Sequence, residues 1–170
     1  MIQERQGDLF NVMTLDEYDE NTVLLHACNC MGVWGSGIAV EFRRRFPDAE
    51  REYRQICQKN TVHSLKLDVY GKGIVLTGNV GCLFTSRSYG KDKDDIASIV
   101  SATYDAVLDM DSRLDRKVKV HSPKINAGLF GVPWQETKDV LDKALAQAKN
   151  IEEWMVWSLK PDFAVSSTKD

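Results

Sequence analysis

Short apolar runs alternate along the chain with segments of helical periodicity. Continuous apolar residues, as in TVLLHA, are typical of strands that are covered on both faces of a sheet. Such runs predict five strands, at residues 22–27, 73–78, 80–85, 118–125 and 154–159. The second and third runs adjoin at Gly78-Asn79, a dipeptide that favours a tight reversal, so we expect a hairpin there.

Apolar residues that recur every three or four positions predict the helices. They lie at residues 38–46, 49–59, 94–110 and 134–148. Strands that alternate with helices predict an α/β domain with helices on both faces of one sheet. No repeat or linker divides the chain, so we expect one domain over residues 1–160 and a C-terminal tail at 161–170.

Composition and charge narrow the possible functions. The chain has 170 residues, 43% of them hydrophobic and 28% charged, which suits one soluble domain with a sizeable core. A formal net charge of -3 does not indicate a surface that coats nucleic acid, and Arg43-Arg44-Arg45 is interpreted as a solvated helix face. We find no apolar stretch of membrane-spanning length and no signal-peptide pattern. Four cysteines suit a reducing compartment, so we expect a cytoplasmic or nuclear monomer without nucleic-acid or membrane partners.

Two glycine-rich loops follow apolar strands and lead into helices. They are HACNCMGVWGSGIA at residues 26–39 and NAGLFGVP at residues 126–133. Ligands of α/β sheets bind beyond the carboxyl ends of the strands. Glycine allows backbone N–H groups to approach a phosphate closely, and a helix N-terminus adds partial positive charge. The two loops together therefore predict a ligand with a diphosphate held between them.

The first loop permits other interpretations. His26, Cys28 and Cys30 alternate along a strand as metal ligands can, but no second ligand cluster completes a tetrahedron, so we predict no metal and no cofactor. A cysteine-dependent phosphatase would need an arginine six residues after the nucleophile, and no cysteine here has one. A dinucleotide fingerprint fails because Val40 stands where the third glycine belongs.

Two further features can be interpreted as structural rather than functional. The DMDSR segment at 109–113 has an Asp-x-Asp pattern but ends a predicted helix, where a charged helix terminus is the simpler interpretation. His26 is either a hydrogen-bonded core histidine or a titratable group at a strand end facing a phosphate site. The local sequence leaves both interpretations of His26 open.

Four segments taken together resemble the macrodomain family, whose members recognise ADP-ribose. They are QGDLF (6–10), HACNCMGVWGSGIAVEF (26–42), GCLFTSRSYG (81–90) and PKINAGLFGVPWQET (123–137). The resemblance extends over nearly the whole chain to residue 159. It implies a three-layer α/β/α macrodomain with a six-stranded mixed central sheet, across whose strand ends ADP-ribose lies.

The resemblance also implies a set of ligand contacts. Asp8 accepts a hydrogen bond from the adenine amino group, and Asn29 contacts the distal ribose. Phe130 either covers that ribose or anchors its loop in the core. The full expected set of substrate-binding residues is Gly7, Asp8, Leu9, Ala27, Cys28, Asn29, Trp34, Gly35, Ser36, Gly37, Ile38, Ala39, Ile125, Asn126, Ala127, Gly128, Leu129, Phe130 and Gly131.

Within the family, the chain resembles the small fungal phosphatases of ADP-ribose 1''-phosphate. Their activity implies a hydrolase that releases the terminal phosphate. We predict His26 and Asn29 as the catalytic residues, because His26 is the only histidine in a ligand loop and Asn29 would orient the ribose. A non-catalytic ADP-ribose-binding module and a hydrolase of protein ADP-ribosyl esters remain alternatives. Many ester-cleaving macrodomains carry asparagine where this chain has His26. The lysine and aspartate of the terminal ADP-ribose glycohydrolases are missing at 85–88 and 127–131, which argues against that chemistry.

Overall fold

A single mixed sheet lies between two layers of helices in the computed structural model, which describes residues 1–59 and 69–159. The strand order is β1-β6-β5-β2-β4-β3, and only β3 runs antiparallel to its neighbour. The strands are β1 (Ile2–Gln6), β2 (Thr22–Asn29), β3 (Gly73–Leu76), β4 (Val80–Ser86), β5 (Val118–Ser122) and β6 (Ile151–Ser158). The predicted three-layer fold with six strands is confirmed, whereas the predicted tail lies outside the described residues.

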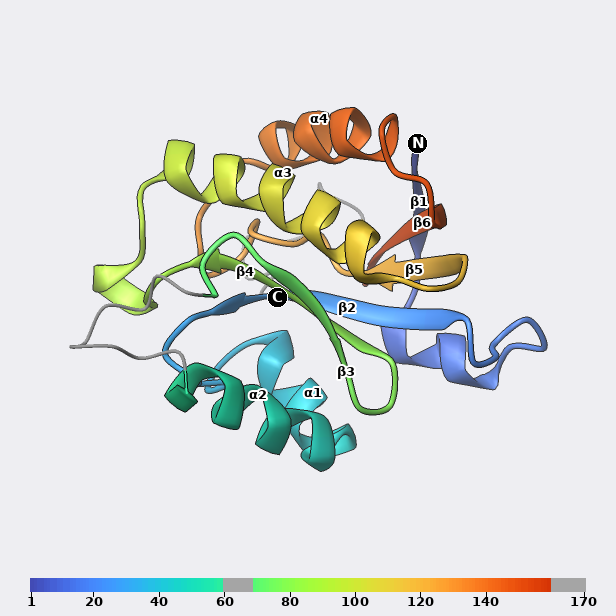
Figure 1. Ribbon diagram of the computed structural model, residues 1–170, viewed down its shortest axis with the longest axis horizontal. Coiled ribbons are helices and arrows are strands. Elements are labelled where there is room, and N and C mark those ends of the chain that lie inside the picture. Colours follow the sequence, from blue (N-terminus) through green and yellow to red (C-terminus); the bar gives the residue numbers. More distant parts are fainter. Residues whose placement is uncertain (60–68, 160–170) are drawn as a thin grey trace.

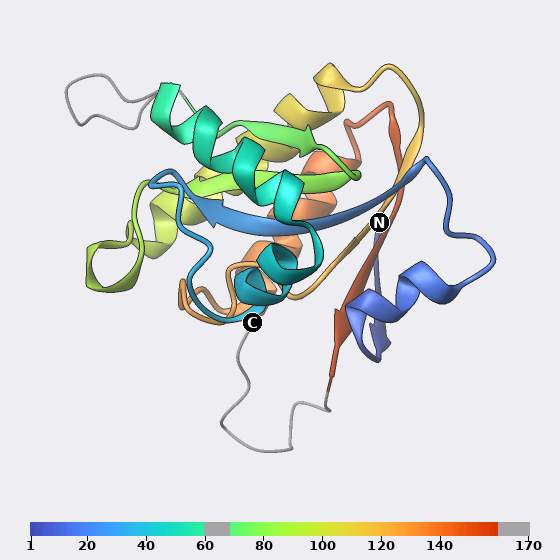
Figure 2. The same ribbon diagram turned by 90° about the horizontal axis from the view of Figure 1, so that it is seen from below.

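Within the described residues, α-helices cover both faces of the sheet (Figure 1). They are α1 (Ile38–Arg45), α2 (Pro47–Lys59), α3 (Ile96–Arg113) and α4 (Trp134–Leu145). Two short 3-10 helices, η1 (Leu9–Thr14) and η2 (Gly90–Asp92), lie in the connections. Figure 2 shows α1 and α2 in front of the sheet, with α3 and α4 behind it. None of the helices in the described ranges is long and apolar enough to cross a membrane.

Each layer of helices encloses its own apolar core. One core joins the α1–α2 side of the sheet to η1 and contains Phe42, Tyr53 and Phe84. The other lies under α3 and α4 and contains Leu25, Met110 and Leu141. Seven of the eight residues of β2 are buried, which explains why its sequence is apolar without alternation.

The observed elements differ from the predicted ones mainly at their ends. β2 continues two residues beyond its apolar run, to Asn29, and β5 ends at Ser122, before Pro123. The apolar pattern did not predict β1, because it is an edge strand that buries only Ile2 and pairs on one side with β6. The β3–β4 hairpin is confirmed, with positive φ angles at Gly78 and Asn79.

The Asp-x-Asp segment near residue 110 has a structural role. Asp109 pairs with Arg113 at 2.8 Å and accepts a hydrogen bond from the backbone N–H of Gly73 at 3.0 Å. Asp111 is 7% exposed, and its carboxylate accepts hydrogen bonds from three consecutive backbone N–H groups at the start of β6, at 149–151. This segment therefore ties the end of α3 to the last strand, and the helix-terminus interpretation is confirmed.

We predict that Asp111→Ala lowers the free energy of unfolding by about 3 kcal/mol, because three backbone donors, one buried and two partly buried, lose a charged acceptor. Asp111→Asn should cost less, since it keeps one acceptor oxygen. The control is Asp115→Ala, whose side chain is 90% exposed beside Arg116. Urea denaturation measures all three variants. Equal stability of Asp111→Ala and Asp115→Ala would contradict the assigned role of Asp111.

Candidate functional site

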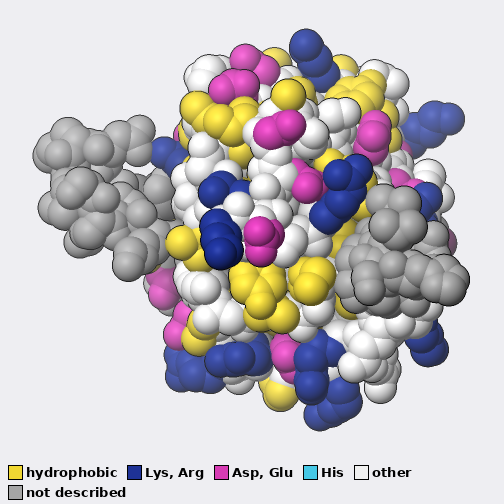
Figure 3. Space-filling view, turned by 90° about the vertical axis from the view of Figure 1, so that its left-hand side faces the viewer, with side chains coloured by type: hydrophobic (Ala, Val, Ile, Leu, Met, Phe, Trp, Pro, Cys, Tyr) yellow, Lys and Arg dark blue, Asp and Glu magenta, His cyan; other side chains and the backbone are white. Residues whose placement is uncertain are grey.

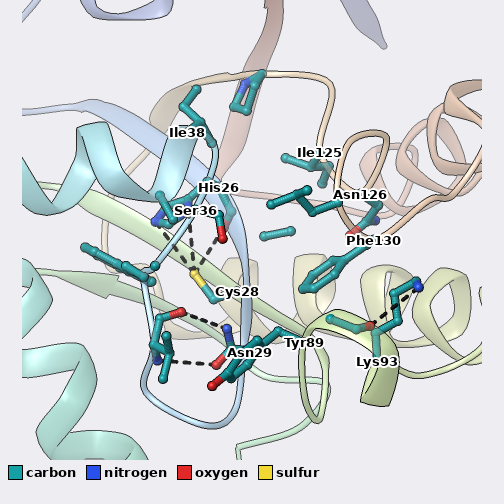
Figure 4. Close-up of a pocket in the computed structure, with 18 residues that line it drawn as sticks. His26, Cys28, Asn29, Ser36, Ile38, Tyr89, Lys93, Ile125, Asn126 and Phe130 are labelled. Carbon is teal, nitrogen blue, oxygen red and sulfur yellow. Dashed lines mark hydrogen bonds between the residues drawn. The ribbon is translucent and has the colours of Figure 1, made fainter. Parts of the chain in front are cut away.

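Two adjoining pockets open beyond the carboxyl ends of the parallel strands. The first, here called the loop pocket, has a volume of about 440 Å³ and lies between the two glycine-rich loops (Figure 4). The second, the strand-end pocket, has a volume of about 410 Å³ and lies beside the ends of β1 and β6. Ile38 and Pro123 line both pockets, so the two adjoin at these residues and are together called the cleft. A cleft with two such halves suits an elongated ligand with two different ends.

Most of the predicted site residues line one of these pockets. In the loop pocket they are His26, Ala27, Cys28, Asn29, Trp34, Gly35, Ser36, Ile38, Ala39, Ile125, Asn126, Leu129 and Phe130. In the strand-end pocket they are Gly7, Asp8, Leu9, Gly37 and Ile38. Ala127, Gly128 and Gly131 line neither pocket and belong to the framework of the second loop. The two glycine-rich segments thus meet across one cleft, as the sequence predicted.

Asn29 shapes the first loop from within. Its side-chain oxygen accepts hydrogen bonds from the backbone N–H of Met31 at 2.9 Å and the hydroxyl of Tyr53 at 3.0 Å. Its Nδ2 donates to the carbonyl oxygen of Val33 at 2.8 Å. One N–H of the amide therefore remains for a ligand, while the rest of the side chain holds the turn that follows β2.

His26 is enclosed by aromatic rings. Its imidazole is 1% exposed, stacks on Phe42 with ring centroids 4.1 Å apart, and meets the edge of Trp34 at 4.6 Å. Both ring nitrogens lie near the sulfur of Cys28, at 3.7 and 3.9 Å. Any proton transfer between His26 and the pocket therefore involves the Cys28 side of the ring.

Cys28 has an unusual thiol environment at the wall of the loop pocket. Burial has the largest single influence and raises the pKa of this thiol. The Cys82 thiol, the His26 ring and the Trp34 indole together outweigh burial and hold the pKa of Cys28 below its usual value. The indole N–H of Trp34 is the one buried side-chain donor in the described residues that has no partner at standard hydrogen-bond geometry. An ionised Cys28 sulfur gives that donor an acceptor.

The second loop depends on Asn126, which has a positive φ of 66°. Its side-chain oxygen accepts a hydrogen bond from Thr85 at 2.9 Å, and its Nδ2 donates to Thr103 at 2.9 Å and to Thr137 at 3.5 Å. Its carbonyl oxygen accepts from the N–H of Val132 at 2.9 Å, closing the loop. The sequence predicted Asn126 as a ligand contact, and the structure shows it also as the junction of β4, α3 and α4.

The backbone amides of the second loop divide into two groups. The N–H groups of Ala127 and Gly131 donate within the loop, to carbonyl oxygens at 124 and 128. Those of Leu129 and Phe130 have no acceptor within the described part of the chain, and both residues line the loop pocket. Phe130 is half-buried and belongs to neither core cluster. This loop can therefore offer two amides to an anion, with the Phe130 ring as a cover.

Charged groups gather in the strand-end pocket. The Oδ1 atom of Asp8 accepts a hydrogen bond from the N–H of Phe10 at 2.9 Å and caps η1, which leaves its other oxygen for a ligand. Arg45 lies 4.6 Å over the Phe10 ring and pairs with Glu41 at 3.2 Å. Arg45 is thus a pocket residue as well as part of a solvated helix face. Trp157 lines the same pocket with its aromatic ring.

Several lining residues were not predicted from the sequence. In the loop pocket they are Val33, Tyr89, Gly90, Lys93 and Pro123. In the strand-end pocket they are Phe10, Glu41, Arg45, Pro123, Lys124, Trp157, Ser158 and Leu159. The GCLFTSRSYG segment includes Tyr89 and Gly90 and could have indicated these two residues. Nothing in the local sequence indicated that the loop after it brings Lys93 to the pocket. Among the described residues, no group of three or more acidic, histidine or cysteine side chains could hold a metal ion.

We predict that iodoacetamide modifies Cys28 before Cys30 and Cys82 in the folded protein at neutral pH. The thiolate is the nucleophile, so a lowered pKa makes Cys28 reactive at lower pH than an ordinary thiol, whereas burial raises the pKa of Cys30 and of Cys82. Peptide mass spectrometry between about pH 5 and pH 9 measures each rate. Cys28→Ser is the control. If Cys28 reacts last, the lowered pKa of its thiol is contradicted.

Comparisons with known proteins identify the family of this chain. The Macro domain family model matches residues 25–141. A protein of Debaryomyces hansenii named ADP-ribose 1''-phosphate phosphatase is 37% identical over 171 residues, covering 84% of this chain and 93% of its own length. A Candida albicans protein of the same name is 34% identical over 157 residues, with 84% and 93% covered.

Solved structures show the same fold. The macrodomain of Mycobacterium tuberculosis DarG superposes with a TM-score of 0.70 at 22% identity, covering 94% of this chain and 99% of that one. Thermosipho africanus DarTG in complex with ADP-ribose gives a TM-score of 0.65 at 20% identity, covering 95% of this chain and 44% of that one. The matched sequence model, the relatives and the fold agree, and the chain belongs to the Macro domain family.

Proposed function

We propose that this protein binds ADP-ribose and hydrolyses ADP-ribose 1''-phosphate to ADP-ribose and phosphate. The observation that carries the proposal is the pair of adjoining pockets. Asp8 lines the strand-end pocket, and the His26–Cys28 pair lines the loop pocket. The loop pocket is also lined by Leu129 and Phe130, whose amides have no acceptor within the described residues. Relatives that are 34% and 37% identical carry the name of this phosphatase and support the same conclusion.

The two pockets suit the two ends of ADP-ribose. Asp8 offers the strand-end pocket an acceptor, and the exocyclic amine of adenine is a donor. Leu129, Phe130, Gly35 and Ser36 line the loop pocket, where their backbone amides can serve as donors for the diphosphate. The distal ribose then occupies the loop pocket, beside Asn29.

The reaction needs a proton for the leaving sugar oxygen. Water attacks the phosphorus atom, the bond from phosphorus to the C1'' oxygen breaks, and the proton that the attacking water gives up is transferred to that oxygen. Among the described residues that line the loop pocket, His26 carries an imidazole and Cys28 a thiol, which are side chains that serve as general acids and bases. We assign this proton transfer to His26, acting at the side of its ring that faces Cys28. We assign the positioning of the ribose to Asn29.

A non-catalytic ADP-ribose-binding module is the second candidate. The enclosure of His26 by Phe42 and Trp34 favours it, because a stacked and buried imidazole also fits a purely structural role. A free-phosphate assay with ADP-ribose 1''-phosphate distinguishes the two candidates. Release of ADP-ribose from modified glutamate, measured in parallel, tests the hydrolysis of protein esters.

The cellular location and assembly state are further parts of the proposal. None of the four cysteines forms a disulfide and all are buried, which suits a reducing compartment such as the cytoplasm or nucleus. We also propose that the protein is a monomer. Light scattering of the purified protein tests the assembly state.

We predict that Asp8→Asn raises the Kd for ADP-ribose about ten- to a hundredfold, because adenine loses a charged acceptor. The asparagine oxygen can still cap η1 at Phe10, so the local fold is kept. Titration calorimetry measures the affinity, and Asp16→Asn, at an exposed carboxylate in the same connection, is the matched control. Unchanged affinity in Asp8→Asn would mean that adenine binds elsewhere.

We predict that His26→Phe damages turnover far more than binding. Phenylalanine keeps the stacking with Phe42 and removes both ring nitrogens, and proton transfer contributes about a hundred- to ten-thousandfold to a rate. The expected result is a large loss of kcat with nearly the same Kd for ADP-ribose and the same melting temperature. His26→Gln keeps a hydrogen-bonding side chain but cannot transfer a proton, so its kcat should fall as much as that of His26→Phe. An intact kcat would make His26 a structural residue.

A further inference from the structure

The loop pocket has a simple charge inventory. Among the described residues that line it, Lys93 is the single lysine or arginine, and no aspartate or glutamate is present. The face shown in Figure 3 carries lysine and arginine side chains interspersed with acidic and apolar ones, not gathered into a continuous basic patch. The positive charge at the loop pocket therefore comes from Lys93 and not from a basic surface around the pocket.

Lys93 lies against the second glycine-rich loop. It follows η2 in the connection between β4 and α3, and its Cε lies 3.9 Å from where a Cβ atom on Gly131 would be. Figure 4 shows it beside Phe130, on the other side of the pocket from His26 and Ser36. A ligand group held between Phe130 and the His26–Cys28 pair would therefore have Lys93 on the Phe130 side, away from His26.

The ammonium group of Lys93 is not committed to a carboxylate. Its Nζ has a single long contact of 3.5 Å, to the carbonyl oxygen of Gly90, and no ion pair within the described residues. The nearby cation Arg87 differs, because it lies 4.5 Å over the Tyr70 ring and 3.8 Å from Asp94. Of the two, Lys93 is the cation that can turn to a ligand.

The loop that carries Lys93 is held in place by its own hydrogen bonds. The Oγ of Ser86, at the end of β4, accepts from the N–H of Asp94 at 3.0 Å and donates to the carbonyl oxygen of Ser88 at 2.7 Å. The N–H of Arg87 donates to Asp94 at 3.0 Å, and that of Lys93 to Gly90 at 3.2 Å. The backbone under the lysine is therefore organised before a ligand arrives.

We propose that Lys93 binds the terminal phosphate of the substrate and so selects phosphorylated over unphosphorylated ADP-ribose. The inference rests on the proposed function. A phosphate monoester carries close to two negative charges at pH 7, whereas the same position in ADP-ribose is a neutral hydroxyl. The Lys93 side chain is exposed, and its ammonium group at the wall of the loop pocket distinguishes these two ligands by charge. Hydrogen bonds between charged partners are stronger than neutral ones.

The test compares Lys93→Gln with Lys91→Gln. Lys91 is an exposed lysine of the same short helix and does not line the pocket, so it controls for net charge. We expect Lys93→Gln to raise KM for ADP-ribose 1''-phosphate about tenfold and to leave the Kd for ADP-ribose unchanged. Lys93→Arg keeps the charge and should recover most of the loss. Added salt should weaken substrate recognition in the wild type more than in Lys93→Gln.

A binding measurement that needs no turnover separates this inference from the proposed function. Inorganic phosphate is titrated into protein saturated with ADP-ribose, and we expect its affinity to fall about tenfold in Lys93→Gln but not in Lys91→Gln. Wild-type protein that releases no phosphate from substrate would overturn the phosphatase, while a Lys93-dependent phosphate site would still stand. Normal turnover with KM and phosphate affinity unchanged in Lys93→Gln would overturn the role of Lys93.

Discussion

The hydrogen bonds of the buried Asn126 side chain are the constraint on which the ligand cleft depends. They join Thr85 at the end of β4 to Thr103 on α3 and Thr137 on α4, inside a region where the three threonines are fully buried. An unsatisfied amide there would cost free energy, so each partner fixes the position of the others. The positive φ of Asn126 then turns the chain into the loop that presents Leu129 and Phe130.

The two walls of the cleft are built by different physical means. The second loop is held by a polar network in the layer of α3 and α4, whereas the first loop rests on an aromatic cluster that includes His26, Trp34 and Phe42. An aromatic floor excludes water and strengthens the influence of the few charges near it. That arrangement explains how a thiol pKa can be lowered despite burial, since the neighbours of Cys28 act on it without competing solvent.

The charges of the cleft are separated along its length. The strand-end pocket contains two carboxylates, Asp8 and Glu41, and two cations, Arg45 and Lys124, while the loop pocket has Lys93 as its fixed charge. The carboxylates can therefore accept hydrogen bonds at one end, and the lysine can hold an anion at the other. A ligand that is a base at one end and a phosphorylated sugar at the other matches this division better than a uniformly charged polymer does.

The sequence by itself determined the buried strands, the hairpin at Gly78-Asn79, the main helices and the two glycine-rich loops. These features depend on local patterns: continuous apolar runs for covered strands, and glycine or asparagine where φ must be positive. It also placed both loops at one cleft, because parallel strands share their carboxyl ends. The edge strand β1 escaped prediction because it buries a single residue, so its pairing with β6 leaves no apolar run in the sequence.

Only the tertiary structure decided what individual side chains do inside the cleft. Nothing near Asn126 in the sequence indicates its three threonine partners, which come from β4, α3 and α4. The burial of His26 comes from Phe42 and Trp34, and the position of Lys93 comes from a loop that folds back toward Gly131. Burial, hydrogen-bond partners and pKa depend on neighbours that are distant along the chain, so these properties exist only once the helices have packed on the sheet.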